Sequence, residues 1–208
     1  MNGVQVINHP LIQNKVSMLR DKNTGVREFR ELVEEISTIL AYEATRDLPT
    51  EDRDVETPCG VAHTKVITTK IGIVSILRAG EGMLNGIHNL MPFAKVGHIG
   101  LYRDPETLNP VQYYCKLPDD IENRVILLVD PMNATGGTAC AGIRLLKNAG
   151  ARDIRLLHIL SCQQGCNRVW SEHPEIPIWS ADYDHELNDH GYIVPGLGDA
   201  GDRMFGTK

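Results

Sequence analysis

One stretch, residues 124–138 (RVILLVDPMNATGGT), restricts the possible folds more than any other part of the chain. After Arg124 come five consecutive apolar residues, 125–129, which are rich in β-branched side chains. Such a run is typical of a strand buried on both faces of a parallel sheet. Asp130 follows directly, at the carboxyl edge where open α/β sheets bind ligands. The stretch therefore predicts an α/β protein with a binding site at this edge.

The turn after this strand suits an anion. Residues 134–138 (ATGGT) combine two glycines with two threonines, and residues 139–149 then follow helical spacing up to Gly150, which is placed as a C-capping glycine. Bare N–H groups and the helix dipole favour a phosphate there, while Asp130 suits sugar hydroxyls or hydrated magnesium. No Gly-Lys-Ser/Thr follows, so this is not a Walker loop. The same pattern also occurs in α/β proteins that bind no phosphate.

The composition of the 208 residues restricts the function classes. A formal net charge of -6 gives none of the excess positive charge that is typical of nucleic-acid-binding proteins. No apolar run approaches the roughly 18 residues of a membrane span, and we expect no signal peptide. The five cysteines are odd in number and scattered, which favours reduced thiols in a cytoplasmic protein. Cys162 and Cys166 are too widely spaced for a zinc knuckle.

The remaining chain alternates between helical and strand patterns. Residues 10–20 predict a helix, Thr24 is a candidate N-cap, and an apolar stripe then marks a longer helix whose face packs on the core or on a second subunit. Residues 55–66 predict two short strands around a turn at 57–60. Further strands are predicted at 71–77, 96–101, 154–160 and 176–180. A helix is predicted at 82–90, with Met83, Leu84, Ile87 and Leu90 inward, and another after the loop 161–165. Residues 105–116 predict a hairpin that is either a mobile lid or a plain exposed hairpin.

Two further features point to a ligand. Arg78 follows the strand at 71–77, where an arginine is natural as an anion contact. The tail from residue 182 is dense in glycine and acids, yet Tyr192, Ile193, Val194, Leu197 and Phe205 predict that it packs back on the protein. Residues 196–201 spell G-x-G-x-x-G, but too few residues follow for a dinucleotide site, which excludes the Rossmann interpretation.

The string at 191–203 (GYIVPGLGDAGDR), ending in FGTK at 205–208, resembles the uracil-binding motif of uracil phosphoribosyltransferases. Residues 129–137 likewise resemble the phosphoribosyl-pyrophosphate (PRPP) loop of type I phosphoribosyltransferases. Counterparts of His9-Pro10-Leu11, residues 42–45, residues 76–80 and Tyr102-Arg103 follow in family order, so the resemblance covers essentially the whole chain. It implies the type I phosphoribosyltransferase fold, an α/β protein with a mostly parallel central sheet flanked by helices. We expect one domain over 1–208, with N-terminal helices at 10–45, a core at about 70–180 and a C-terminal hood at 182–208.

The implied reaction transfers the 5-phosphoribosyl group from PRPP to N1 of uracil, giving UMP and pyrophosphate in pyrimidine salvage. By resemblance, Asp130, Arg78 and Arg103 are catalytic, and Ile193, Gly198, Asp199 and Ala200 bind uracil. PRPP would contact Arg78, Arg103, Asp130, Pro131, Met132, Asn133, Ala134, Thr135, Gly136, Gly137, Thr138 and Asp199. The cofactor would be Mg²⁺, with no direct protein ligand, held by PRPP and by waters near Asp130 and Asp199. A glycine-rich loop lets backbone amides approach the narrow edge of uracil and reject cytosine, which would leave polar groups unpaired.

Four departures from the family pattern bear on activity. Asn133 stands where leucine is usual, and its amide would bond PRPP or face solvent. Glu81 brings a negative charge near the proposed pyrophosphate site if it points inward. Ser75 replaces a usual proline, and residues 161–165 (SCQQG) replace an Ala-Pro-Glu-Gly type turn.

Three alternatives to a uracil enzyme remain. They are an RNA-binding nucleotide sensor, which the acidic pI of about 5.7 disfavours, an enzyme for a purine, and a paralogue that binds PRPP or UMP with poor turnover. The family and the apolar stripe predict a homodimer or higher homo-oligomer acting on small-molecule substrates, with no nucleic-acid or membrane partner. We also include GTP binding among the expected properties, although no motif decides whether such a nucleotide activates the protein.

Overall fold

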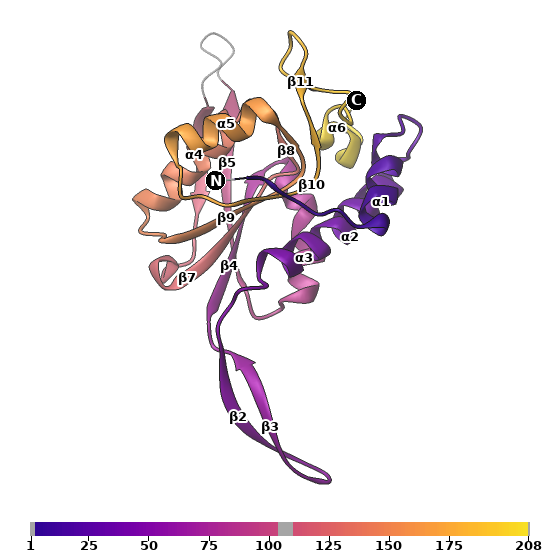
Figure 1. The fold of residues 1–208 in the computed structure, drawn as a ribbon. Coiled ribbons are helices and arrows are strands. Elements are labelled where there is room, and N and C mark those ends of the chain that lie inside the picture. Colours follow the sequence, from indigo (N-terminus) through magenta and orange to yellow (C-terminus); the bar gives the residue numbers. More distant parts are fainter. Residues whose placement is uncertain (1–2, 104–109, 208) are drawn as a thin grey trace.

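The computed structural model describes residues 3–103 and 110–207. The strands of its main sheet are β1 (Gln5–Val6), β4 (Lys70–Leu77), β5 (Lys95–Arg103), β6 (Pro110–Lys116), β7 (Arg124–Val129), β8 (Met132–Asn133), β9 (Asp153–Cys162) and β10 (Ile178–Asp184). Within the described residues, the strand order is β1-β10-β9-β7-β4-β5-β6, and β8 also pairs with β9. The pairs are parallel except for β5 with β6. The predicted mostly parallel sheet is confirmed (Figure 1).

Period-two alternation along β7 divides the core between the two faces of the sheet. Ile126 and Leu128 pack with α4 (Gly137–Asn148) and α5 (Gln163–Glu172). Leu127 and Val129 pack on the opposite face with α1 (Pro10–Arg20), α2 (Val26–Ala44) and α3 (Leu84–Leu90). Every residue of β7 is buried, because helices cover both faces of this strand.

The two N-terminal helices form as expected, with one correction at their junction. The apolar stripe of α2, which includes Phe29, Ile36 and Leu40, is buried in the core. This stripe is therefore a core face and not a surface for a second subunit. Thr24 is not the N-cap of α2: Gly25 takes that position without a side-chain bond, and the Thr24 hydroxyl instead donates to the carbonyl of Met18 at 2.5 Å.

Several predicted boundaries shift. The helix at 82–90 is divided into a 3₁₀ helix, η1 (Ala79–Met83), and α3. Leu90 is 39% exposed and does not point inward. α5 begins at Gln163, inside the expected loop 161–165, while the strand expected at 176–180 begins at Ile178 and runs to Asp184.

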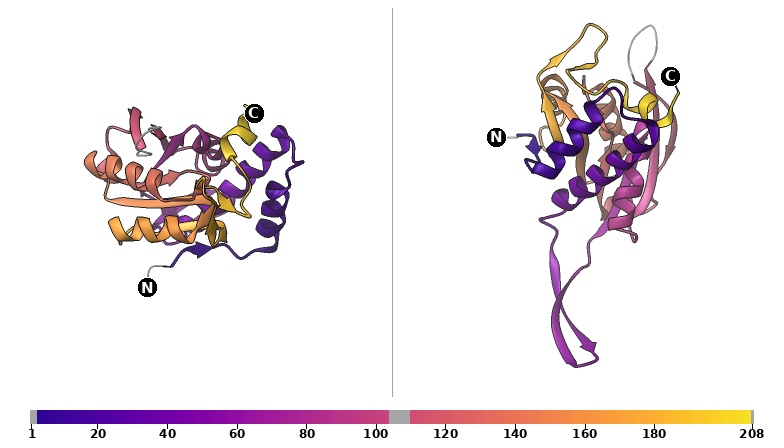
Figure 2. Two further views of the ribbon diagram at one scale, coloured as in Figure 1. Left: turned by 90° about the horizontal axis from the view of Figure 1, so that it is seen from above. Right: turned by 90° about the vertical axis from the view of Figure 1, so that its right-hand side faces the viewer.

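One hairpin projects from the body of the molecule, and a second lies at the edge of the main sheet. β2 (Thr50–Thr57) and β3 (Gly60–Ile67) pair antiparallel, confirming and lengthening the predicted strands, and they project as an arm (Figures 1 and 2). β5 and β6 form the second hairpin. The tip of the predicted lid, residues 104–109, lies outside the described residues.

The C-terminal hood comprises β11 (Glu186–Leu187), β12 (Ile193–Val194) and α6 (Ala200–Phe205). Ile193, Leu197 and Met204 are buried in the cluster that also contains the residues of α1 and α2. Tyr192, Val194 and Phe205 were expected to pack but are 41%, 39% and 36% exposed. The hood lies beside the N-terminal helices, above the carboxyl edge of the sheet (Figure 2).

Candidate active site

A cavity of about 350 Å³ lies between the turn after β7 and the hood. It brings together two segments about seventy residues apart in sequence, around Asp130 and around Asp199. Of the predicted site residues, those that line it are Asp130, Met132, Asn133, Ala134, Thr135, Gly136, Thr138, Ile193, Gly198, Asp199 and Ala200. The cavity stands at the carboxyl edge of a mostly parallel sheet, where such folds bind ligands.

One end of the cavity is the start of α4. Gly136 adopts a left-handed conformation with φ 78° and is the N-cap of this helix, a conformation that glycine takes without steric cost. A Cβ atom on Gly136 would lie 2.6 Å from the carbonyl oxygen of Gly165, the residue that brings α5 against the turn. The N-terminal amides of α4 and the helix dipole make this turn suitable for an anion.

Asp130 directly follows β7 and lies half-buried in the wall of the same cavity. Its carboxylate Oδ1 accepts from the backbone N–H of Met132 at 3.3 Å. Its backbone carbonyl lies 2.7 Å from Nδ1 of His158, a buried residue of β9. Burial lowers the pKa of His158 to about 4, despite the opposing effect of this hydrogen bond. His158 is therefore neutral near pH 7 and donates from Nδ1 to the Asp130 carbonyl.

Of the remaining predicted PRPP residues, Arg78, Pro131 and Gly137 do not line the cavity. Arg78, at the end of β4, is 59% exposed in its side chain and pairs with Asp202 of the hood at 3.4 Å. Arg103 is the last residue of β5, and its side chain lies outside the part of the chain that the structure describes. Pro131 instead accepts from the N–H groups of Ile159 and Leu160 through its carbonyl. Gly137 faces the side chain of Arg168.

The other end of the cavity is built by the hood. Ile193 is 4% exposed, and Gly198 has φ 81°. Asp199 is the N-cap of α6, accepting from the N–H of Asp202 at 2.9 Å. These residues present a backbone-rich wall, which suits recognition of a flat, polar base.

Further lining residues were not among the predicted site residues. They are Ala79, Ala139, His190, Gly191, Tyr192 and Gly201. Gly191, Tyr192 and Gly201 stand within the glycine-rich string, and Ala79 follows Arg78, so their neighbours in sequence were a usable signal. His190 precedes the string, and nothing in its local pattern marks it.

The divergent positions take definite environments. Asn133, one of the cavity-lining residues, is 2% exposed and directs Nδ2 toward Sγ of Cys166 at 3.5 Å, so its amide does not face solvent. Glu81 is exposed. Ser75 is buried, with Oγ 2.8 Å from Nδ1 of His98 on the neighbouring strand.

Two groups of side chains carry donor atoms of the kind that bind metal ions. Asp130 and Asp199 line the same cavity, and carboxylate oxygens suit a hard divalent cation and its waters. Cys140, Glu172 and His173 also lie within 4.8 Å of one another. In that group, however, Glu172 already pairs with Arg144 and Arg168, and Lys147 lies 3.0 Å from the His173 ring. These cations oppose a metal there.

The sheet, the turn after β7 and the hood define the class of type I phosphoribosyltransferases. A solved adenine phosphoribosyltransferase from Trypanosoma brucei shares this fold at a TM-score of 0.60 and 14% identity, covering 94% of this chain and 87% of that one. A solved protein from Aquifex aeolicus is more similar, with a TM-score of 0.92, 35% identity and 98% coverage of both chains.

The family follows from closer relatives. A family model described as uracil phosphoribosyltransferase matches residues 6–207. The uracil phosphoribosyltransferase of Thermoanaerobacter sp. strain X514 is 62% identical over 99% of both chains, and that of Geobacillus sp. strain WCH70 is 57% identical over 100% of both. The chain belongs to the uracil phosphoribosyltransferase family.

Proposed function

We propose that this chain transfers the 5-phosphoribosyl group of PRPP to N1 of uracil, giving UMP and pyrophosphate in pyrimidine salvage. The observation that carries the proposal is that one cavity has a helix start suited to an anion at one end and a glycine-rich backbone wall at the other. Family membership supports uracil as the base. The two relatives named above are uracil phosphoribosyltransferases, and each matches this chain over almost its whole length.

The reaction asks the protein for positioning and charge stabilisation. As the bond from C1 to pyrophosphate breaks, positive charge builds on the ribose, N1 of uracil bonds to C1 from the opposite face, and the N1 proton is released to water. Residues 134–138 would hold the 5′-phosphate, Asp130 the ribose hydroxyls, and the backbone of Ile193, Gly198 and Ala200 the base. Fixing both reactants in line supplies much of the rate enhancement without a covalent intermediate. Arg78 would contact pyrophosphate after leaving Asp202, and Arg103 would contact it from the end of β5.

Family membership indicates dependence on a divalent metal, and we propose Mg²⁺. Asp130 and Asp199 would hold the hydrated ion through its waters, and the ion would neutralise charge on the leaving pyrophosphate. We also propose a cytoplasmic location, because all five cysteines are unpaired thiols. No helix in the described part of the chain is long and apolar enough to cross a membrane. GTP binding stays a prediction.

We further propose that the chain forms a homodimer or larger homo-oligomer. Four large apolar side chains, Tyr42, Ile67, Leu90 and Phe93, line one groove at the base of the arm and are 39% to 60% exposed. Clustered exposed apolar side chains mark interaction sites. A two-stranded hairpin is marginal in water on its own, so the projecting arm also favours a second copy beside it.

The test is UMP formation from PRPP with magnesium, offering uracil, cytosine or hypoxanthine. We expect turnover with uracil alone, and a loss on the order of hundredfold in Asp130→Asn, which removes a carboxylate charge from the site. Asp119→Asn, an exposed residue on the loop before β7, is the matched control and should behave as wild type. Turnover with hypoxanthine would instead indicate a purine enzyme. Binding of PRPP or UMP without turnover of any base would refute the enzymatic proposal.

A further inference from the structure

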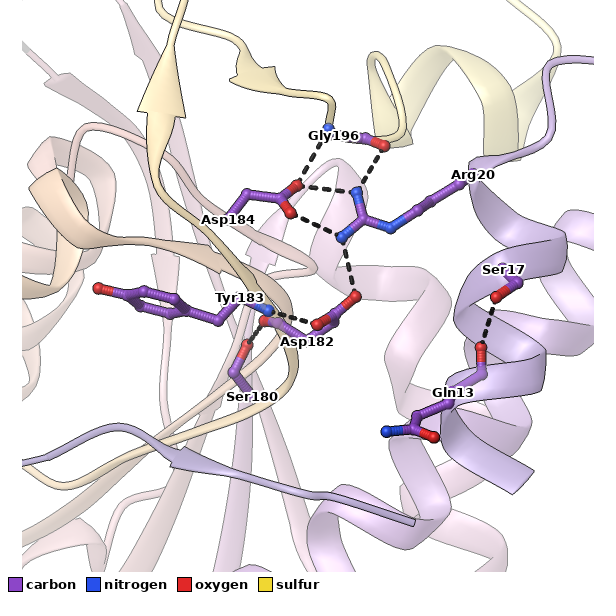
Figure 3. Close-up of polar contacts among 8 residues, drawn as sticks. All are labelled: Gln13, Ser17, Arg20, Ser180, Asp182, Tyr183, Asp184 and Gly196. Atoms are coloured by element: carbon purple, nitrogen blue, oxygen red, sulfur yellow. Dashed lines mark hydrogen bonds and ion pairs between the residues drawn. The ribbon is translucent and has the colours of Figure 1, made fainter. Parts of the chain in front are cut away.

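An ion-paired junction joins the first helix to the base-binding end of the cavity. Arg20, the last residue of α1, donates from Nη1 to Asp184 Oδ2 and to the carbonyl of Gly196, each at 2.8 Å. Its Nη2 donates to Asp184 Oδ1 at 2.9 Å and to Asp182 Oδ2 at 2.8 Å. Figure 3 shows the guanidinium group lying between the end of β10 and the hood. One side chain thus joins three separate segments of the chain.

Both polar backbone groups of Gly196 are held at this junction. Its carbonyl accepts from Arg20, and its N–H donates to Asp184 Oδ2 at 3.0 Å (Figure 3). The Asp184 side chain is only 10% exposed and that of Arg20 21%. Charged groups shielded from water make stronger hydrogen bonds than neutral ones. The position of Gly196 is therefore fixed by charged partners at the end of α1 and the end of β10.

A second arginine, which belongs to the hood, bonds the peptide after Gly196 and also reaches back to the end of α1. Arg203, in α6 of the hood, donates to the carbonyls of Leu197 and Leu19 from Nη1 and to that of Asp21 from Nη2. Its guanidinium carbon lies 4.5 Å from the centre of the Phe29 ring. The end of α1 thus holds the hood through Arg20, and the hood holds the end of α1 through Arg203. We call Arg20, Arg203 and Asp184 the arginine clasp.

The clasp acts on the stretch that carries the base-binding residues. Gly196 and Leu197 lie between Ile193 and Gly198, both of which line the cavity. Gly196 has φ 61°, and a Cβ atom placed on it would lie only 2.0 Å from the carbonyl oxygen of Ile193. Because these two backbones are in close contact, a shift of Gly196 displaces the Ile193 peptide.

We propose that Arg20 is a positioning residue for the nucleobase, acting with Asp184 through Gly196 on the peptides of Ile193 and Gly198. The inference rests on the proposed uracil phosphoribosyl transfer. It distinguishes the two substrates, since the clasp holds the hood, whereas PRPP would be held mainly by the turn between β7 and α4 and by the hood only through Asp199. Loss of the clasp should therefore weaken base recognition and leave PRPP recognition almost unchanged.

The chain offers a closely matched control. Arg155 of β9 also bonds one backbone carbonyl, that of Ala44, and two carboxylates, those of Asp47 and Asp153. It is 7% exposed and lies near the start of β9. Asp184 pairs with Cys162 at the other end of that strand. Arg155→Lys removes a comparable network without touching the hood.

Steady-state kinetics of Arg20→Lys, Arg20→Gln, Asp184→Asn and Arg155→Lys test the proposal. We expect the KM for uracil to rise on the order of tenfold to a hundredfold in Arg20→Gln, since small displacements of a binding group have effects of this size. Arg20→Lys should show a smaller rise, because an ammonium retains the charge but not the planar set of donors. In each clasp variant the KM for PRPP should stay within about twofold of wild type, and Arg155→Lys should change neither KM.

Equal rises in both KM values, or a KM for uracil in Arg20→Gln no different from that in Arg155→Lys, would overturn the proposal. If Arg20→Gln does not fold, Asp184→Asn decides, because an asparagine there still accepts from the Gly196 N–H but loses its charge. Amide hydrogen exchange of the wild type needs no substitution: the Gly196 N–H should be protected, and exchange at the rate of the exposed hood residues would refute the clasp. Absence of uracil turnover in the wild type would refute the proposed reaction, while the exchange result would still decide on the clasp.

Discussion

His158 lies in an environment that changes its ordinary acid–base chemistry. It is buried in β9, its Nδ1 donates to the Asp130 carbonyl, and its Nε2 has no hydrogen-bond partner among the described residues. Burial lowers the pKa to about 4, against about 6.5 in an unfolded chain. Between these two values the unfolded state binds more protons than the folded state. This histidine therefore makes the folded state less stable as pH falls from about 6.5 to about 4.

We predict that His158 contributes a loss of about 3 kcal/mol in the free energy of unfolding between pH 7 and pH 4. Chemical denaturation over this range measures the loss. His158→Asn is the comparison, because its amide nitrogen can occupy the place of Nδ1 without titrating. The variant should have a shallower pH dependence than wild type. Identical slopes would show that His158 does not titrate as its burial requires.

The environment of Asn133 shows where sequence reasoning stops at the level of single residues. Its neighbours in the turn, Asp130 and residues 134–138, carry a pattern that placed them at one ligand site. The direction of the Asn133 side chain depends on Cys166, which is thirty-three residues further along and enters only through α5. Arg78 was recognisable as a charge at a strand end, but its pairing with Asp202 depends on how the hood folds. Partners brought by a different element leave no local signal.

At the level of elements, the close approach of α5 to the turn between β7 and α4 was not predictable from the loop 161–165. A Cβ atom on Gly165 would lie 2.6 Å from the carbonyl oxygens of both Asn133 and Ala134. These are backbone atoms of the turn itself, which a flexible side chain cannot relieve. Gly165 thus allows the first turn of α5 to support the residues that would bind the 5′-phosphate.

We predict that Gly165→Ala raises the KM for PRPP on the order of tenfold, because the turn must move to admit the methyl group. The KM for uracil should change much less, which is the reverse of the pattern expected for the clasp variants. Gly25→Ala is the control, since a Cβ atom there meets nothing within 4 Å. Unchanged PRPP kinetics in a folded Gly165→Ala protein would show that α5 does not set the position of the turn.

Across the whole molecule, the sequence predicted the sheet because uninterrupted or nearly uninterrupted apolar runs such as 71–77 and 125–129 are typical of buried parallel strands, and it predicted the helices from their helical spacing of apolar residues. β1 and β8 were missed because two residues are too few for a pattern. The hood was recognised from its motif, while its attachment to α1 came only from the structure: the hydrogen-bonded pair of Arg20 and Asp184 is 164 residues apart. Contacts over such a separation follow from the fold and not from local sequence.

The exposed groove at the base of the arm leads to the last prediction, on assembly. Phe93 is 60% exposed and lines the groove together with Tyr42, Leu90 and other residues. If a second copy covers it, light scattering should give at least about twice the chain mass of 23.1 kDa. Phe93→Asp should then shift the protein toward monomer, because burying an unpaired carboxylate at an interface is costly. Leu11→Asp, on α1 and equally exposed at 60%, should leave the mass unchanged. A monomeric wild type, or an effect of both substitutions alike, would contradict an interface at this groove.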